Sequence, residues 1–169
     1  MPLITDIGVS VSAKNSKAND FTTSYDELAR RYAVHLDSGT GAGRADRIFH
    51  DQRTLAASAN ETLDLAGTLT DNLGVATVFA RVKAIIIQAA AANANNVVVG
   101  ANGSADFVGL LNAAGTITLR PGMWFAAAAS SADATGMAVT ATTADLIKVA
   151  NGGAGTSVTY DIIVIGSSV

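Results

Sequence analysis

The chain has 169 residues and a mass of 17.0 kDa, enough for one domain with a core of its own. Apolar residues make up 49% and charged residues only 15%, and the mean hydropathy is +0.34, which argues against intrinsic disorder. A formal net charge of −3 argues against binding to nucleic acid, and the absence of cysteine excludes disulfides, thiolate metal sites and thiol nucleophiles.

The first residues predict a strand followed by a polar segment. Residues 1–6 lack the basic and apolar regions of a secretion signal, so we expect a soluble protein made in the cytoplasm. Ile7, Val9 and Val11 alternate with small residues, which is typical of a strand. Residues 13–23 are polar, and we interpret them as a mobile loop or the tail end of an N-terminal arm.

Residues 24–36 allow two interpretations. Ser24 to Glu27 matches a capping box, which would begin a helix. The same segment alternates between larger and smaller side chains from Leu28 to Leu36, as a strand does. We favour the strand because residues 37–41 then form a natural turn. Further strands are predicted at 47–55 and 61–65, with a turn at 71–74.

Residues 78–87 could be helical by composition, but three consecutive isoleucines and the shared parity of Arg81 and Lys83 favour a strand. Asn102-Gly103 suits a tight hairpin, and Pro121-Gly122 suits a type II turn. The remaining predicted strands are 97–99, 116–119, 123–129, 137–141, 146–150 and 156–165.

Short strands separated by turn residues, without alternating long helices, predict an all-β fold. We expect an antiparallel β-sandwich of jelly-roll type with an N-terminal arm. Residues 1–27 are expected to form that arm, or a first strand plus loop, and residues 28–169 the sandwich domain. The longest apolar run, residues 84–92, is too short to span a membrane.

Few residues have the types and spacing that catalysis requires. His50-Asp51 resembles a pair of metal ligands, but the chain has only one other histidine, His35, so we expect His50 on a strand face. His35 and Asp37 share a parity, which predicts a cross-strand polar contact. Three carboxylate pairs have the spacing of acid–base partners, and we interpret them as solvated ion pairs: Asp26/Glu27, Asp46/Asp51 and Glu61/Asp64.

Two glycine-rich segments, 100–103 and 152–155, lack the following helix and the lysine of phosphate-binding loops, so we interpret both as turns. Residues 71–74 offer too few oxygen ligands for a calcium site. We therefore expect no catalytic residue, no metal site and no cofactor, and an enzyme is the least favoured class.

Trp124-Phe125 follows the Pro-Gly turn. We favour a place in the core or in an interface over a ligand-binding role. Exposure of Trp124 or Tyr160 in a groove would instead favour carbohydrate binding.

Charge is concentrated in the first half of the chain. Residues 1–83 contain nine of the 11 basic and ten of the 14 acidic side chains. The remaining charged residues are Asp106, Arg120, Asp133, Asp145, Lys148 and Asp161. A segment so poor in charge is expected to lie against other subunits, while residues 14–53 face a larger shell or solvent.

Five segments together carry a resemblance to known proteins: residues 47–58, 61–67, 133–140, 144–151 and 158–166. They resemble small β-rich virion proteins of tailed bacteriophages, and the likeness extends over roughly residues 32–166. It implies a head decoration (cement) protein, a jelly-roll trimer seated on the capsid surface.

We therefore expect a homo-oligomeric virion protein, most simply a trimer, that binds the major capsid protein and stabilises the head through subunit interfaces. Nucleic acid and membranes are not expected partners. The alternatives are a carbohydrate- or receptor-binding virion module and a tail or head-completion protein.

Overall fold

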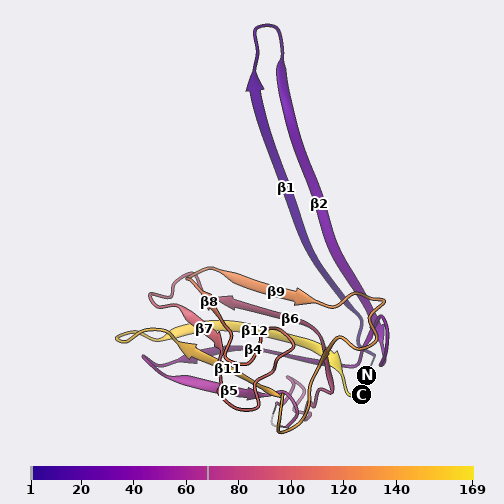
Figure 1. The fold of residues 1–169 in the computed structure, drawn as a ribbon, viewed down its shortest axis with the longest axis vertical. Coiled ribbons are helices and arrows are strands. Elements are labelled where there is room, and N and C mark those ends of the chain that lie inside the picture. The colour runs from indigo at the N-terminus through magenta and orange to yellow at the C-terminus, as the bar shows by residue number, and fades with distance from the viewer. Residues whose placement is uncertain (1, 68) are drawn as a thin grey trace.

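The computed structural model describes residues 2–67 and 69–169, and every regular element within them is a β-strand (Figure 1). The strands are β1 (Thr5–Ala18), β2 (Thr23–Ser38), β3 (Arg44–Ala45), β4 (Arg47–Leu55), β5 (Asn60–Asp64), β6 (Arg81–Ala89), β7 (Val97–Gly100), β8 (Thr116–Leu119), β9 (Trp124–Ala128), β10 (Met137–Ala138), β11 (Leu146–Asn151) and β12 (Val158–Ser167). The prediction of an all-β fold is confirmed, and no helix in the described residues is long and apolar enough to cross a membrane.

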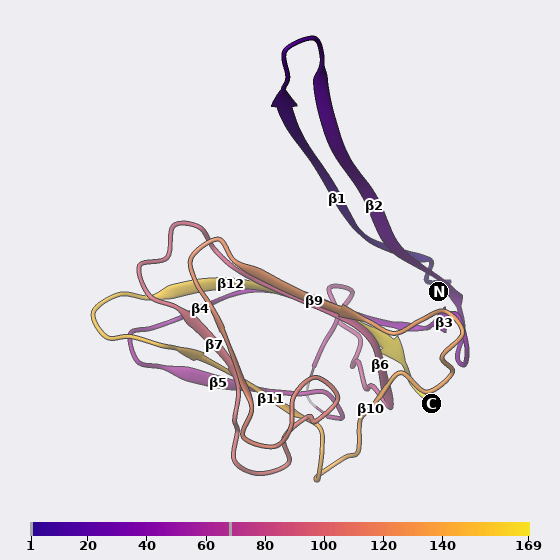
Figure 2. The same cartoon turned by 45° about the horizontal axis from the view of Figure 1, so that its top comes forward.

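The first two strands form a long antiparallel hairpin that extends away from the other sheets (Figures 1 and 2). Its pairing runs from Thr5 opposite Leu36 to Ala18 opposite Thr23, and residues 19–22 form the turn. The strand predicted for residues 24–36 is confirmed. The loop interpretation of residues 13–23 is wrong for residues 13–18, because pairing with β2 keeps these polar residues extended.

Apart from β3, which pairs in parallel with β2, the other strands form two antiparallel sheets in a sandwich-like arrangement. One has the order β4-β12-β6, with β9 and β10 both paired to the free edge of β6. The other has the order β5-β11-β7-β8. Strands distant in sequence are therefore neighbours: β4 pairs with β12, β5 with β11 and β6 with β9.

The main core lies between the two sheets. Every second residue of β12, from Val158 to Val164, is buried there, as strand alternation requires. The opposite sheet contributes buried side chains such as Leu63, Val97 and Val149. A smaller cluster on the outer face of the β4-β12-β6-β9 sheet is centred on four buried residues: Leu36, Ala45, Ala84 and Ile165. Because Leu36 belongs to β2, this cluster fastens the base of the hairpin to the sheet.

A β-bulge interrupts the pairing of β6 with β12 beside this junction. Ile165 pairs with Ala84 but Gly166 pairs with Val82, so Lys83 is the extra residue. The Lys83 ammonium is buried, and it donates to the carbonyl oxygens of Asp133 at 2.8 Å and Ala134 at 2.6 Å. Burial lowers the pKa of Lys83 below its ordinary value.

Two predicted turns are confirmed and one predicted hairpin is wrong. The amide of Met123 donates to the carbonyl of Arg120 across Pro121-Gly122, and the Gly74 amide donates to the Asp71 carbonyl. Asn102-Gly103 does not connect neighbouring strands directly, because β7 and β8 are joined by the whole of residues 101–115. The Asp106 carboxylate organises that longer loop by accepting hydrogen bonds from its backbone amides.

The boundary expected between residues 27 and 28 lies within β2, which is continuous there. The division into an arm and a sandwich domain stays a prediction.

Candidate functional site

The structure separates the carboxylates that the sequence placed in pairs. Glu27 binds Lys14 at 2.6 Å, across the hairpin. Asp46 accepts hydrogen bonds from the amide and hydroxyl of Ser168, and Asp64 caps the amide of Ala66. Each of these carboxylates has a structural partner of its own: the contact of Glu27 is an ion pair, as predicted, whereas those of Asp46 with Ser168 and of Asp64 with Ala66 are hydrogen bonds.

His35 and His50 have different surroundings. The His35 ring lies between two carboxylates, with Nδ1 2.8 Å from Asp6 and Nε2 3.3 Å from Asp37. The hydrogen bonds that Asp6, and then Asp37, accept from the ring raise the pKa of His35. The cross-strand contact predicted for His35 is therefore present, with Asp6 directly opposite it on β1. His50 lies 3.3 Å from the side-chain amide of Asn72.

Tyr160 is buried at the edge of the main core. Its hydroxyl donates to Glu61 Oε1 at 2.8 Å, and the other oxygen of Glu61 binds Arg53. Burial, reinforced by Glu61, raises the pKa of Tyr160 far above its ordinary value. Because the ring is fully buried, Tyr160 cannot stack on a sugar.

Neither glycine-rich segment is arranged to hold a phosphate. The amides of Asn102 and Gly103 already donate to Asp106, so the groups that would face an anion are used within the loop. Residues 152–155 lie in the loop that connects β11 to β12, where the Asn95 side-chain amide donates to the Ala154 carbonyl and the Gly153 amide donates to the side-chain oxygen of Asn151. Across residues 2–67 and 69–169, no group of three His, Asp or Glu side chains is placed to hold a metal ion.

The most distinctive surface lies on one face of the hairpin. Residues directly opposite in an antiparallel pair point to the same side, and the pairs alternate between the two sides. One side therefore presents an apolar stripe, which consists of Ile7, Val9, Val11 and Ala13 on β1 and Leu28, Tyr32 and Val34 on β2. The other side presents mainly polar and small residues, among them Ser10, Ser12, Lys14 and Arg31.

The apolar stripe is covered only at its base. Ile7 and Val34 pack against the cluster that contains Ala84 and Ile165. Farther along the hairpin, Leu28 is 46% exposed and Tyr32 is 69% exposed. The stripe thus begins as part of a packed cluster and continues as an open surface.

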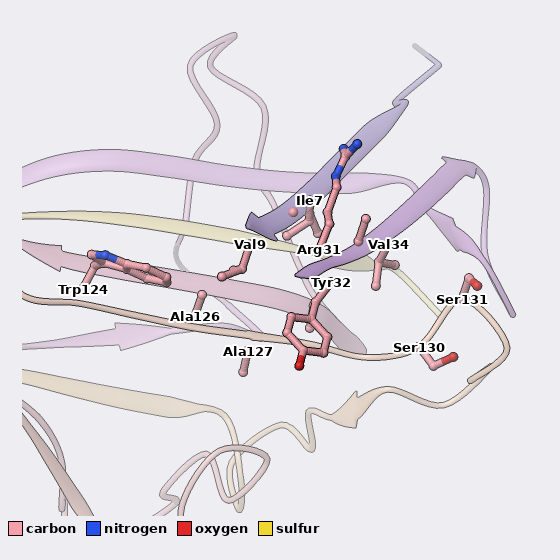
Figure 3. Close-up of a pocket in the computed structure, with 13 residues that line it drawn as sticks. Ile7, Val9, Arg31, Tyr32, Val34, Trp124, Ala126, Ala127, Ser130 and Ser131 are labelled. Atoms are coloured by element: carbon pink, nitrogen blue, oxygen red, sulfur yellow. The ribbon is translucent and has the colours of Figure 1, made fainter. Parts of the chain in front are cut away.

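A groove of about 780 Å³ separates the proximal stripe from the outer face of β9. Figure 3 shows Val9 and Tyr32 on the side of the hairpin that faces β9, with Val9 near Ala126, and Arg31 pointing away from β9. Trp124 also lines this groove and is 51% exposed.

The exposure of Trp124 corrects the core interpretation of Trp124-Phe125. Phe125 is the member of the pair that packs against the main core, and Trp124 points outward because adjacent strand residues alternate. The interface interpretation of Trp124 stays a prediction. Sequence reasoning missed the apolar stripe, although the alternation of Ile7, Val9 and Val11 was its signal.

No protein-family model, no curated protein and no solved structure matches this chain. The resemblance to virion proteins is therefore a hypothesis.

Proposed function

We propose that the chain folds as a jelly roll with an N-terminal arm formed by the hairpin. Four nested strand pairings support this topology: β4 with β12, β5 with β11, β6 with β9 and β7 with β8. Such nesting describes one long hairpin folded over into two sheets, which is the jelly-roll pattern.

The function proposed for this fold is structural: the protein self-associates and stabilises a larger protein shell, as a capsid decoration protein of a tailed bacteriophage does. The observation that supports this most strongly is the partly uncovered apolar stripe. A two-stranded hairpin is at best marginally stable alone in water. Contiguous exposed apolar surface marks interaction sites. Coverage of the stripe by another protein chain would stabilise the hairpin and would bury its exposed apolar surface.

Two further features agree with an assembly role. The charge-poor half supplies β7 to β12 and most of β6, so association through these strands would desolvate few ions. The polar side of the hairpin has its own ion pair, Lys14 with Glu27, and is suited to face solvent. A trimer bound to the major capsid protein is the form of the proposal that the resemblance implies.

The experiment has two arms. Size-exclusion chromatography with light scattering should give an oligomer, with a trimer expected, at micromolar concentration. Co-sedimentation with capsids of the encoding phage that lack the protein should then recover it in the particle fraction. A stable monomer would count against self-association, and an empty pellet would count against capsid binding.

A carbohydrate-binding virion module is the second candidate, because the exposed Trp124 ring borders a groove that also contains Ser130 and Ser131. The burial of Tyr160 removes the other aromatic ring that was expected to stack on sugar. Binding to a glycan array that disappears in Trp124→Ala would favour this candidate. A ring-shaped particle in electron micrographs would instead favour a tail or head-completion protein.

A further inference from the structure

We infer that the apolar stripe of one copy docks on the outer face of the β9-β6-β12 sheet of a second copy. This inference rests on the proposed self-association and names the two surfaces that meet. The donor surface is the distal part of the stripe, beyond Ile7 and Val34. The acceptor surface consists of Ile86, Trp124, Ala126 and Ile163.

The acceptor residues form one continuous patch. Ile86 of β6 pairs with Ala126 of β9 on one side and with Ile163 of β12 on the other, so all three side chains point outward together. Trp124 lies two residues along β9 from Ala126, on the same face. A second groove, of about 500 Å³, lies between this patch and β1.

A second copy is the matched occupant because the chain already makes this kind of contact with itself. At the base of the hairpin, Ile7 and Val34 pack on Ala84 and Ile165, which belong to the same outer face. The distal stripe continues the same apolar composition at the same two-residue spacing. The distal stripe can therefore pack against the rest of that outer face on a second copy.

Charge complementarity supports the same pairing. Arg30 interrupts the stripe opposite Val11, and among the residues that the structure describes it has no ion-pair partner. Asp161 is the charged residue of β12 on the acceptor face, next to Gln88, and its side chain accepts a hydrogen bond from Gln52. One cation on the donor surface thus meets one anion beside the acceptor patch.

The distal stripe, residues 9–13 and 28–32, is about 17 Å long and about 10 Å wide, so its face covers roughly 170 Å². A copy that donates one hairpin and receives another buries roughly 340 Å² through the stripe, so the remainder of a standard interface of ~800 Å² per partner comes from residues around it. Because donor and acceptor surfaces differ, the contact can close into a ring.

The test uses the full chain and its single tryptophan. Leu28 and Ala29 are adjacent on β2, both are exposed, and they point to opposite sides of the hairpin. Leu28→Glu places a charge in the docked surface, and Ala29→Glu is the matched control on the polar side. Association is measured by light scattering across a dilution series, and exposure of Trp124 is measured by acrylamide quenching and emission wavelength.

We expect Leu28→Glu to weaken self-association on the order of 100-fold, because a carboxylate would be buried against apolar side chains. Trp124 emission should shift to longer wavelength and quench more readily. Ala29→Glu should match the wild type in both measurements. Circular dichroism of both variants checks that the sandwich is folded.

Cross-linking provides a readout that does not depend on weakening the assembly. The chain has no cysteine, so Val11→Cys and Ala126→Cys can be placed on two differently tagged copies that are expressed together. A short bismaleimide should join the two copies, and replacing Val11→Cys with Ser12→Cys, on the polar side, should abolish the product.

The outcomes separate this inference from the proposed function. An oligomer that Leu28→Glu leaves intact and that gives no Val11–Ala126 cross-link would overturn hairpin docking while self-association stands. A wild-type chain that stays monomeric would overturn both. A monomer that binds capsids through Leu28 would assign the stripe to the shell protein, and would overturn the second copy as its occupant.

Discussion

Replacement of Gly166 by alanine tests how tightly β12 packs against β6 beside the bulge at Lys83. A Cβ atom at Gly166 would overlap the carbonyl oxygen of Arg81 and lie 2.9 Å from the Phe79 ring. That carbonyl belongs to the backbone at the start of β6 and cannot rotate away. The ends of β6 and β12 would have to separate, and the hydrogen bond from the Asp46 amide to the Gly166 carbonyl, at 3.0 Å, would be strained.

The expected magnitude follows from these contacts. Overpacking costs about 1–3 kcal/mol, and each backbone hydrogen bond lost adds about 1 kcal/mol. We therefore expect Gly166→Ala to lower the free energy of unfolding by about 3 kcal/mol. Urea denaturation followed by circular dichroism, at one fixed protein concentration, measures this change.

Gly8→Ala is the matched control, because the nearest atom to a Cβ there is 3.5 Å away, at the Arg31 side chain. It should change the free energy of unfolding by less than about 0.5 kcal/mol. If Gly166→Ala also costs less than about 1 kcal/mol, the sheet accommodates the methyl group and the reasoning about the bulge is refuted.

Three further predictions concern ionisable groups. Tyr160→Phe removes the hydroxyl that donates to Glu61 and should lower the free energy of unfolding by about 1–2 kcal/mol, and an unchanged urea midpoint would contradict this. The raised pKa of His35 means that its pairing stabilises the fold fully below about pH 6.5 and is lost as pH rises through that higher pKa. Asp6→Asn should lower the His35 pKa in an NMR titration, and a constant pKa would argue against this pair. Burial disfavours the charged form of Lys83, which lowers its pKa and costs stability at neutral pH. The free energy of unfolding of the wild type, relative to that of Lys83→Met, should therefore rise as pH approaches 10.5. A difference between these two that is flat with pH would show that Lys83 titrates normally.

The sequence was sufficient to predict where most strands lie. Val97–Val99 and residues 47–55 are strands because apolar alternation and β-branched side chains act locally, and the structure confirms them. The turn at Pro121-Gly122 was equally accessible, since proline and glycine specify backbone dihedrals by themselves. Residues 13–18 were not accessible, because their polar side chains favour no strand and only pairing with β2 makes them one.

The candidate site depended on features that local patterns do not contain. The alternation of Val9 and Val11 is visible in the chain, but a stripe exists only because the hairpin register places Val9 opposite Tyr32. Whether Trp124 points into the core or out of it depended on which face of β9 another sheet covers.

Side-chain alternation along a strand follows from backbone geometry, so the sequence alone determined that this chain is built from β-strands and where most of them run. Strand register, the bulge at Lys83 and the apolar surface left uncovered depend on contacts between residues far apart in the chain. Only the tertiary structure decided these, because each contact is stabilised by partners that no local segment contains.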